Sequence, residues 1–168
     1  PVVVVSALSK VTDLLYRISD AAASGNAAET AALLGELRSR HVNLASELLE
    51  QSPALKESAV SSVNEICDKL AGLVRAVCAV GELSDRNKAI IISNGELLSS
   101  TIICFTMNAK GIRTNFIDAR QMMITSSSYL KGEPDEKEIM ERVPAVVAKA
   151  YEGMDAVITQ GFVGVTEG

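Results

Sequence analysis

The strongest constraint on the fold is the run of β-branched residues from Val2 to Val5. An apolar run without polar alternation is typical of a strand that is covered on both faces, as in a parallel sheet. We therefore expect this strand to be central in its sheet. After a short polar loop, apolar residues between Lys10 and Ala23 recur at helical spacing. The chain thus begins as a strand, a loop and a helix.

A helical insertion is expected over residues 27–83, because no convincing strand occurs there. A leucine-rich stretch with helical spacing ends at Ser52-Pro53, a pair that breaks one helix and allows another to start. The second stretch has Val63, Ile66 and Leu70 on one side. Together the two stretches predict an antiparallel helical hairpin.

The second half of the chain returns to a mixed pattern. Ser84-Asp85 is expected to cap a helix over residues 88–107, and a further helix is expected from Asp135 to about Tyr151, kinked or divided by Pro144. Predicted strands are 112–117, a weaker one at 122–125, and a buried one at 156–159. The order predicts an α/β sandwich with a mainly parallel sheet and helices on both faces.

Composition excludes several classes of function. The net charge of −5 argues against a general nucleic-acid binder, which needs an excess of Lys and Arg. The three cysteines form no CxxC pair, so neither a disulfide framework nor a zinc site is suggested, and a reducing intracellular compartment is expected. Apolar runs such as 89–92 are far shorter than the roughly 20 residues that cross a bilayer, so no membrane partner is expected.

Two loops are expected to carry the chemistry, because ligands of such sheets bind beyond the carboxyl ends of the strands. The loop after Val5 offers the hydroxyls of Ser6, Ser9 and Thr12 at the start of a helix, where an oxyanion is favoured. Alternatively, Ser9 or a neighbour only caps the helix. The other loop is Gln160 to Gly164. No glycine-rich phosphate loop of the Walker type is present.

Glu96 is the second candidate, because it follows Gly95 in an apolar helical stretch. A carboxylate is costly to bury, so Glu96 either reaches solvent or meets a positive partner such as the ammonium group of a substrate. His41 follows Arg38 and Arg40 in the leucine-rich helical stretch and is expected at the surface. The cysteines are expected to be small core residues.

Four segments resemble the aspartate kinases of the amino-acid kinase superfamily, in the same order and at similar spacing. They are "VVVVSALSKVTDLL", "NGELLSSTIICFTMNAKGI", "FIDARQMMIT" and "VITQGFVG". The resemblance covers essentially the whole chain. It implies a three-layer sandwich of the amino-acid kinase type, with residues 1–168 as a partial domain that contains the aspartate-binding half.

The resemblance also implies a reaction. Aspartate kinases transfer the γ-phosphate of ATP, with Mg²⁺, to the side-chain carboxylate of L-aspartate, giving 4-phospho-L-aspartate for the synthesis of lysine, threonine and methionine. By position, Ser6 and Thr12 would help to hold aspartate, and Glu96 would receive its amino group. Gly161 and Phe162 match the loop near the bound amino acid. A cytoplasmic or, in a plant, plastid homo-oligomer is implied.

The chain also departs from the family. Family members begin with a Lys-Phe-Gly-Gly-Thr segment that handles phosphates. After the Gly-Phe-Val-Gly loop they continue into a nucleotide-binding half and regulatory ACT domains. Neither part is present in the 168 residues, so we expect this chain alone to be inactive and assign no residue to catalysis, ATP or metal. The position beside strand 2–5 should be empty or filled by another chain. The alternative is a binding or assembly module that retains the kinase fold without the reaction.

Overall fold

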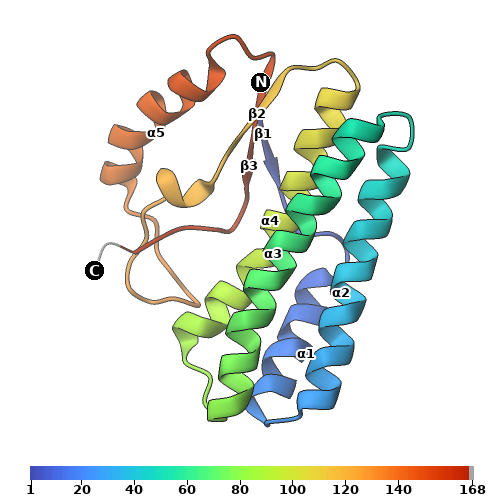
Figure 1. Cartoon of the computed structure of the whole chain (residues 1–168). Coiled ribbons are helices and arrows are strands. Elements are labelled where there is room, and N and C mark those ends of the chain that lie inside the picture. Colours follow the sequence, from blue (N-terminus) through green and yellow to red (C-terminus); the bar gives the residue numbers. More distant parts are fainter. Residues whose placement is uncertain (167–168) are drawn as a thin grey trace.

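The computed structural model describes residues 1–166, so the last two positions of the predicted domain lie outside the described residues (Figure 1). Its sheet has three parallel strands: β1 (Val2–Val5), β2 (Thr114–Ile117) and β3 (Ala156–Gln160). The strand order is β1-β3-β2. The predicted α/β class with a parallel sheet is confirmed.

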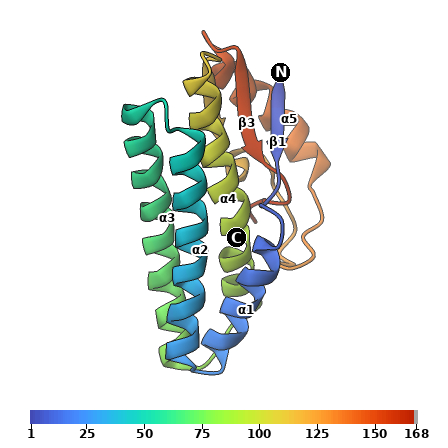
Figure 2. The ribbon, with the colours of Figure 1, turned by 90° about the vertical axis from the view of Figure 1, so that its right-hand side faces the viewer.

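The described residues also form six helical elements. They are α1 (Val11–Ala23), α2 (Ala27–Leu48), α3 (Pro53–Val80), α4 (Asp85–Ala109), the 3₁₀ helix η1 (Ala119–Gln121) and α5 (Glu136–Tyr151). The hairpin of α2 and α3 occupies the predicted insertion. Figure 2 shows α4 between this hairpin and the sheet, with α5 on the other side of the sheet. The result is a small three-layer sandwich.

Side chains cap several helices as their sequences predict. Ser84 Oγ accepts a hydrogen bond from the backbone N–H of Asn87 at 3.2 Å, and Asp135 Oδ1 accepts one from Glu138 at 3.1 Å. The start of α1 is different, because its first boundary residue, Lys10, is left-handed with φ 62° and no side chain caps the helix. The interpretation of Ser9 as a cap is therefore wrong. Its carbonyl instead accepts a hydrogen bond from Arg40 Nη2 at 2.7 Å.

The main core lies among α1 to α4, and a smaller one of Ile117, Met122 and Val157 lies under α5. The prediction that His41 is a surface residue is wrong, since its side chain is fully buried in the larger core. Its Nδ1–H donates to the carbonyl of Leu37 at 2.7 Å. Burial lowers the pKa of His41, so the neutral ring is favoured.

Strand β1 lies at an edge of the described sheet, so the prediction that it is central is wrong. The central strand is β3, which pairs with both others. Val2 and Val4 are accordingly 47% and 64% exposed. In the described sheet β1 pairs with β3 on one side only, which is compatible with the expected position that is empty or filled by another chain.

Two local predictions also need correction. Residues 122–125 form no regular strand; η1 precedes them, and only isolated bridges pair Ile124 with Val165 and Thr125 with Pro134. Of the two expected effects of Pro144, a kink or a division, the division does not occur, because α5 continues through this residue. None of the α5 residues is fully buried, so the carbonyl that Pro144 leaves without a partner can be hydrated.

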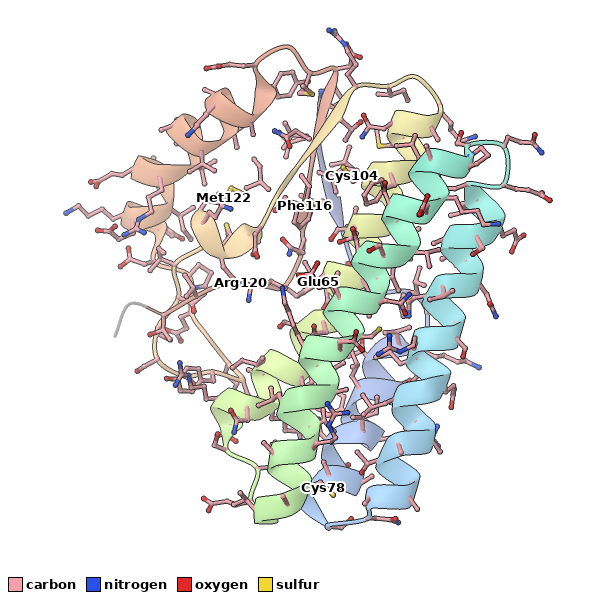
Figure 3. The ribbon with its side chains drawn as sticks, in the orientation of Figure 1. Glu65, Cys78, Cys104, Phe116, Arg120 and Met122 are labelled. Atoms are coloured by element: carbon pink, nitrogen blue, oxygen red, sulfur yellow. The ribbon has the colours of Figure 1, made fainter. Side chains whose placement is uncertain are left out.

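The three cysteines are free, as expected from their number and spacing. Cys67 is buried, and the other two are half-buried; Figure 3 shows Cys78 near the lower end of the molecule, far from Cys104. Among the described residues, one helix, α4, is long and apolar enough to cross a membrane by composition alone. It packs here between the hairpin and the sheet.

A close approach brings α4 against α1 and the loop after β1. A Cβ atom at Gly95 would lie 2.9 Å from Ala7 Cβ and 3.2 Å from Leu15 Cδ1. Real Cβ atoms do not approach so closely, so only glycine fits here without a shift. Gly72, in the middle of α3, provides a comparison, because a Cβ there would meet nothing within 4 Å.

We predict that Gly95→Ala is less stable than Gly72→Ala by about 1–3 kcal/mol, the usual cost of overpacking. The gain in helix propensity is similar at both positions and cancels in this difference. Chemical denaturation of the two variants measures it. Equal stabilisation by both substitutions would show that α4 and the loop are not in tight contact.

Candidate functional site

A cavity of about 470 Å³ lies at the carboxyl end of the sheet. Ser6 follows β1 and Phe162 follows β3, and parallel pairing brings these two strand ends to the same edge. The remaining walls come from α1, α4 and the loop at 126–134. Its lining residues are Ser6, Ala7, Thr12, Tyr16, Ala89, Ile92, Ser93, Glu96, Tyr129, Leu130 and Phe162.

Four of the five predicted binding residues line this cavity: Ser6, Thr12, Glu96 and Phe162. Gly161 lies beside it. A Cβ atom at Gly161 would lie 3.7 Å from Ser6 Oγ. The backbone N–H of Gly161 donates a hydrogen bond to the Val5 carbonyl at 2.9 Å. This hydrogen bond continues the β1–β3 ladder and holds the two predicted loops side by side.

The loop after β1 is fastened to α4 by Ser99. The buried hydroxyl of Ser99 donates to the carbonyl of Ser6 at 2.8 Å, and it also lies 3.1 Å from the carbonyl of Glu96. These residues are far apart in sequence, so this contact fixes where Ser6 stands relative to α4. Ser99 was part of the segment that carried the family resemblance, but its spacing alone gave no indication of this role.

Glu96 is only 7% exposed, which contradicts its interpretation as a solvated surface residue. Burial raises the pKa of its carboxyl group, while its own backbone N–H and that of Ala7 act in the opposite direction. Among the described residues no basic side chain forms an ion pair with it. The cavity therefore has a buried acid without a protein cation, a site suited to a positively charged ligand group.

Phe162 stands at the rim in an unusual conformation. Its φ of 55° is left-handed, and its side chain is 97% exposed. Such a backbone costs free energy in a residue other than glycine, and residues of this kind cluster at binding sites. The aromatic ring is thus available to cover a ligand in the cavity.

The sequence did not identify several lining residues. Tyr16 lies one helical turn after Thr12, and Ser93 lies one turn before Glu96, so helical spacing could have indicated both. Tyr129 and Leu130 lie in an irregular loop without periodicity, so no pattern indicated them.

The charges that line the described cavity do not suit a nucleoside triphosphate. Its lining contains one carboxylate and no Lys or Arg side chain. Among residues 1–166, no group of three or more His, Cys, Asp or Glu side chains could hold a metal ion. At the start of α1, the N–H of Val11 already donates to Leu8 O at 3.0 Å. The cavity is suited to a small molecule with a cationic group.

No protein-family profile matches the chain. It is 24% identical over 167 residues to the bifunctional aspartokinase/homoserine dehydrogenase 2 of Zea mays, covering 99% of this chain and 18% of that protein. It is 28% identical over 164 residues to the aspartokinase of Chlamydia muridarum, covering 98% of this chain and 33% of the other. The chain thus spans a third or less of these relatives' length.

Two solved structures share the fold. Escherichia coli aspartokinase III in complex with lysine and aspartate superposes with a TM-score of 0.85 at 22% identity, over 99% of this chain and 35% of that one. The same enzyme in complex with aspartate and ADP gives a TM-score of 0.83 at 23% identity, over the same shares. The resemblance to aspartate kinases is confirmed: over nearly its whole length, this chain is similar to a region of the aspartokinases and has the fold of that region.

Proposed function

We propose that this chain is part of an aspartate kinase and that its cavity binds L-aspartate, the acceptor of the ATP γ-phosphate, which yields 4-phospho-L-aspartate. The observation that carries the proposal is the buried carboxylate of Glu96, which has no ion-pair partner among the described residues, in a cavity that the hydroxyls of Ser6 and Thr12 also line. The names of the relatives, and the aspartate in the two aspartokinase III complexes, also support it.

In this proposal each residue has one task. The Glu96 carboxylate accepts hydrogen bonds from the ammonium group of aspartate, and these are strong because both partners are charged. The hydroxyls of Ser6 and Thr12 donate to carboxylate oxygens. Phosphoryl transfer depends mainly on positioning and charge neutralisation, so binding the acceptor in a fixed orientation contributes substantially to catalysis.

A bound ammonium group would also reduce the free-energy cost of ionising Glu96. Without a ligand, burial raises the pKa of this carboxyl group, so ionising it costs free energy. A cation beside it favours the ionised form and lowers its pKa. Ligand binding and ionisation of Glu96 are therefore linked, and aspartate binds better as the pH rises through the pKa of the free site.

We also propose that the protein acts in the cytoplasm or, in a plant, in the plastid, since the maize relative is named chloroplastic. A homo-oligomer remains part of the proposal. The leucine-rich hairpin of α2 and α3 offers a groove of about 570 Å³ that another subunit could contact.

These 168 residues alone are proposed to lack kinase activity, because no Lys or Arg of the described residues lines the cavity to neutralise phosphates. We expect no ATP-dependent aspartyl phosphate from the purified chain of this length, measured by trapping the acyl phosphate with hydroxylamine. Formation of the product would contradict this. The alternative is a module that binds without catalysing, and it would give no activity even at the protein's full natural length.

The role of Glu96 is tested in the protein at its full natural length. Glu96→Gln keeps the shape but removes the charge, so kcat/KM for aspartate should fall roughly ten- to a hundredfold. The KM for ATP should change little. Ser6→Ala should act in the same direction but less, because it removes one neutral donor.

The matched control is Glu65→Gln, the same change at an exposed carboxylate that pairs with Lys69 on α3. It should alter kcat/KM by no more than about twofold. An effect of Glu96→Gln as small as that of this control would remove Glu96 from the site.

A further inference from the structure

We propose that Gln160 is a positioning residue of the candidate site, whose side-chain amide joins the ends of β2 and β3 and thereby sets where Phe162 lies at the rim of the cavity. The inference rests on the proposed function, because it concerns how the cavity holds L-aspartate. Gln160 does not line this cavity, so it acts through Phe162 and not through a contact with the ligand.

The side chain of Gln160 extends the contact between two strands beyond their backbone pairing. The register of β2 and β3 ends where Ile117 pairs with Thr159. Gln160 is the last residue of β3, and its Oε1 atom accepts a hydrogen bond from the backbone N–H of Ala119 at 2.7 Å. Gln160 is 4% exposed and Ala119 is fully buried. Because a buried hydrogen bond is costly to lose, this contact holds the first residue of η1 against the end of β3.

The other half of the amide faces a carboxylate. A backbone N–H only donates, so the atom bonded to Ala119 is the amide oxygen, and the NH₂ group of Gln160 is left for another partner. Burial raises the pKa of Asp118, but hydrogen bonds from the side chains of Arg120 and Gln160 lower it more, so this pKa lies below its ordinary value. Gln160 therefore has an N–H donor on one side and an ionised acceptor on the other.

The segment that begins with η1 also holds the far end of the loop at 161–164. The N–H of Val165 donates to the carbonyl of Met123 at 2.9 Å, and the N–H of Thr125 donates to the carbonyl of Val165 at 2.8 Å. Both ends of this short loop are thus tied to residues 119–125, by the side-chain amide at one end and by backbone hydrogen bonds at the other.

Phe162 depends on such anchors because its own side chain makes little contact with the protein. The ring is 97% exposed, and the backbone is left-handed with φ 55°. A backbone of this kind persists only where the surrounding structure over-determines it. The ring does not supply this constraint, so the hydrogen bonds at the two ends of the loop must supply it. Without the amide of Gln160 the loop can relax to a negative φ, and the ring then leaves the rim of the cavity.

A purely structural role makes a different prediction. If Gln160 only stabilises the end of the sheet, its loss should lower the melting temperature and leave the Kd for L-aspartate unchanged. If it positions Phe162, its loss should weaken binding, and it should do so only while the ring of Phe162 is present.

The test is calorimetric binding of L-aspartate, without nucleotide, to the protein at its full natural length. Gln160→Met keeps a side chain of similar length but removes the amide, and it should raise the Kd about tenfold. Gln121→Met is the matched control, because it makes the same change at an exposed position of η1, and it should have no effect. Asp118→Asn keeps the acceptor for Ala119 but removes the charged partner of the amide, and it should raise the Kd about threefold.

A double-mutant cycle with Phe162→Ala shows whether Gln160 acts through the ring. Phe162→Ala alone should raise the Kd about tenfold, because the ligand loses its apolar cover. Adding Gln160→Met to it should raise the Kd by less than about twofold more, because the ring that the amide positions is gone.

Two results would overturn the inference and leave the proposed function intact, provided that Glu96→Gln still weakens binding. One is a Kd for Gln160→Met within twofold of the unsubstituted protein, and the other is an undiminished effect of Gln160→Met when Phe162→Ala is also present. If Gln160→Met does not fold, Asp118→Asn takes its place in the cycle and is judged in the same way. Failure of the unsubstituted protein to bind L-aspartate would instead overturn the proposed function.

Discussion

The site depends on one close contact, between Gly95 of α4 and the loop that follows β1. Because Gly95 has no side chain, α4 lies against Ala7 and Leu15 at a distance that a Cβ atom would not allow. The next residue, Glu96, is thereby placed against the backbone of Ala7, and Ser99, one turn later, donates to the carbonyl of Ser6. The absence of a side chain at Gly95 thus allows the hydroxyl-bearing loop after β1 to lie beside the buried carboxylate of Glu96.

The same contact has an electrostatic consequence. It buries a carboxylate without supplying a cation from the described residues, and the raised pKa of Glu96 reflects that cost. The cost falls when a ligand brings an ammonium group. Binding of a cationic group therefore offsets the cost of ionising the buried Glu96, so the site favours a positively charged ligand group over a neutral or negative one.

The sequence predicted the elements better than their environment. The valine run, the capping residues Ser84 and Asp135, and the break at Pro53 are local features, and the structure confirms the elements they imply. Whether a strand is central depends on which strands pair with it, so the same valine run did not reveal that β1 lies at an edge. His41 was misjudged because its polar neighbours outweighed its helical spacing from Leu37 and Ala45, which face the core.

The site itself was predicted mainly through the resemblance. The sequence alone allowed Glu96 either to be solvated or to be buried beside a positive partner. Only the fold shows that its side chain is buried. Tyr129 and Leu130 reach the cavity from a loop without periodicity, and Tyr16 was one polar position among several on α1. Such residues become visible only when the fold brings distant segments together.

The most direct test of the account is the pKa of the Glu96 carboxyl group, measured by carbon NMR on selectively labelled protein with and without L-aspartate. The account predicts a pKa above the ordinary value of 4.5 in the free protein and a clear decrease when aspartate binds. An ordinary pKa that does not respond to saturating aspartate would show that Glu96 is neither desolvated nor in contact with the ligand, and would contradict the account.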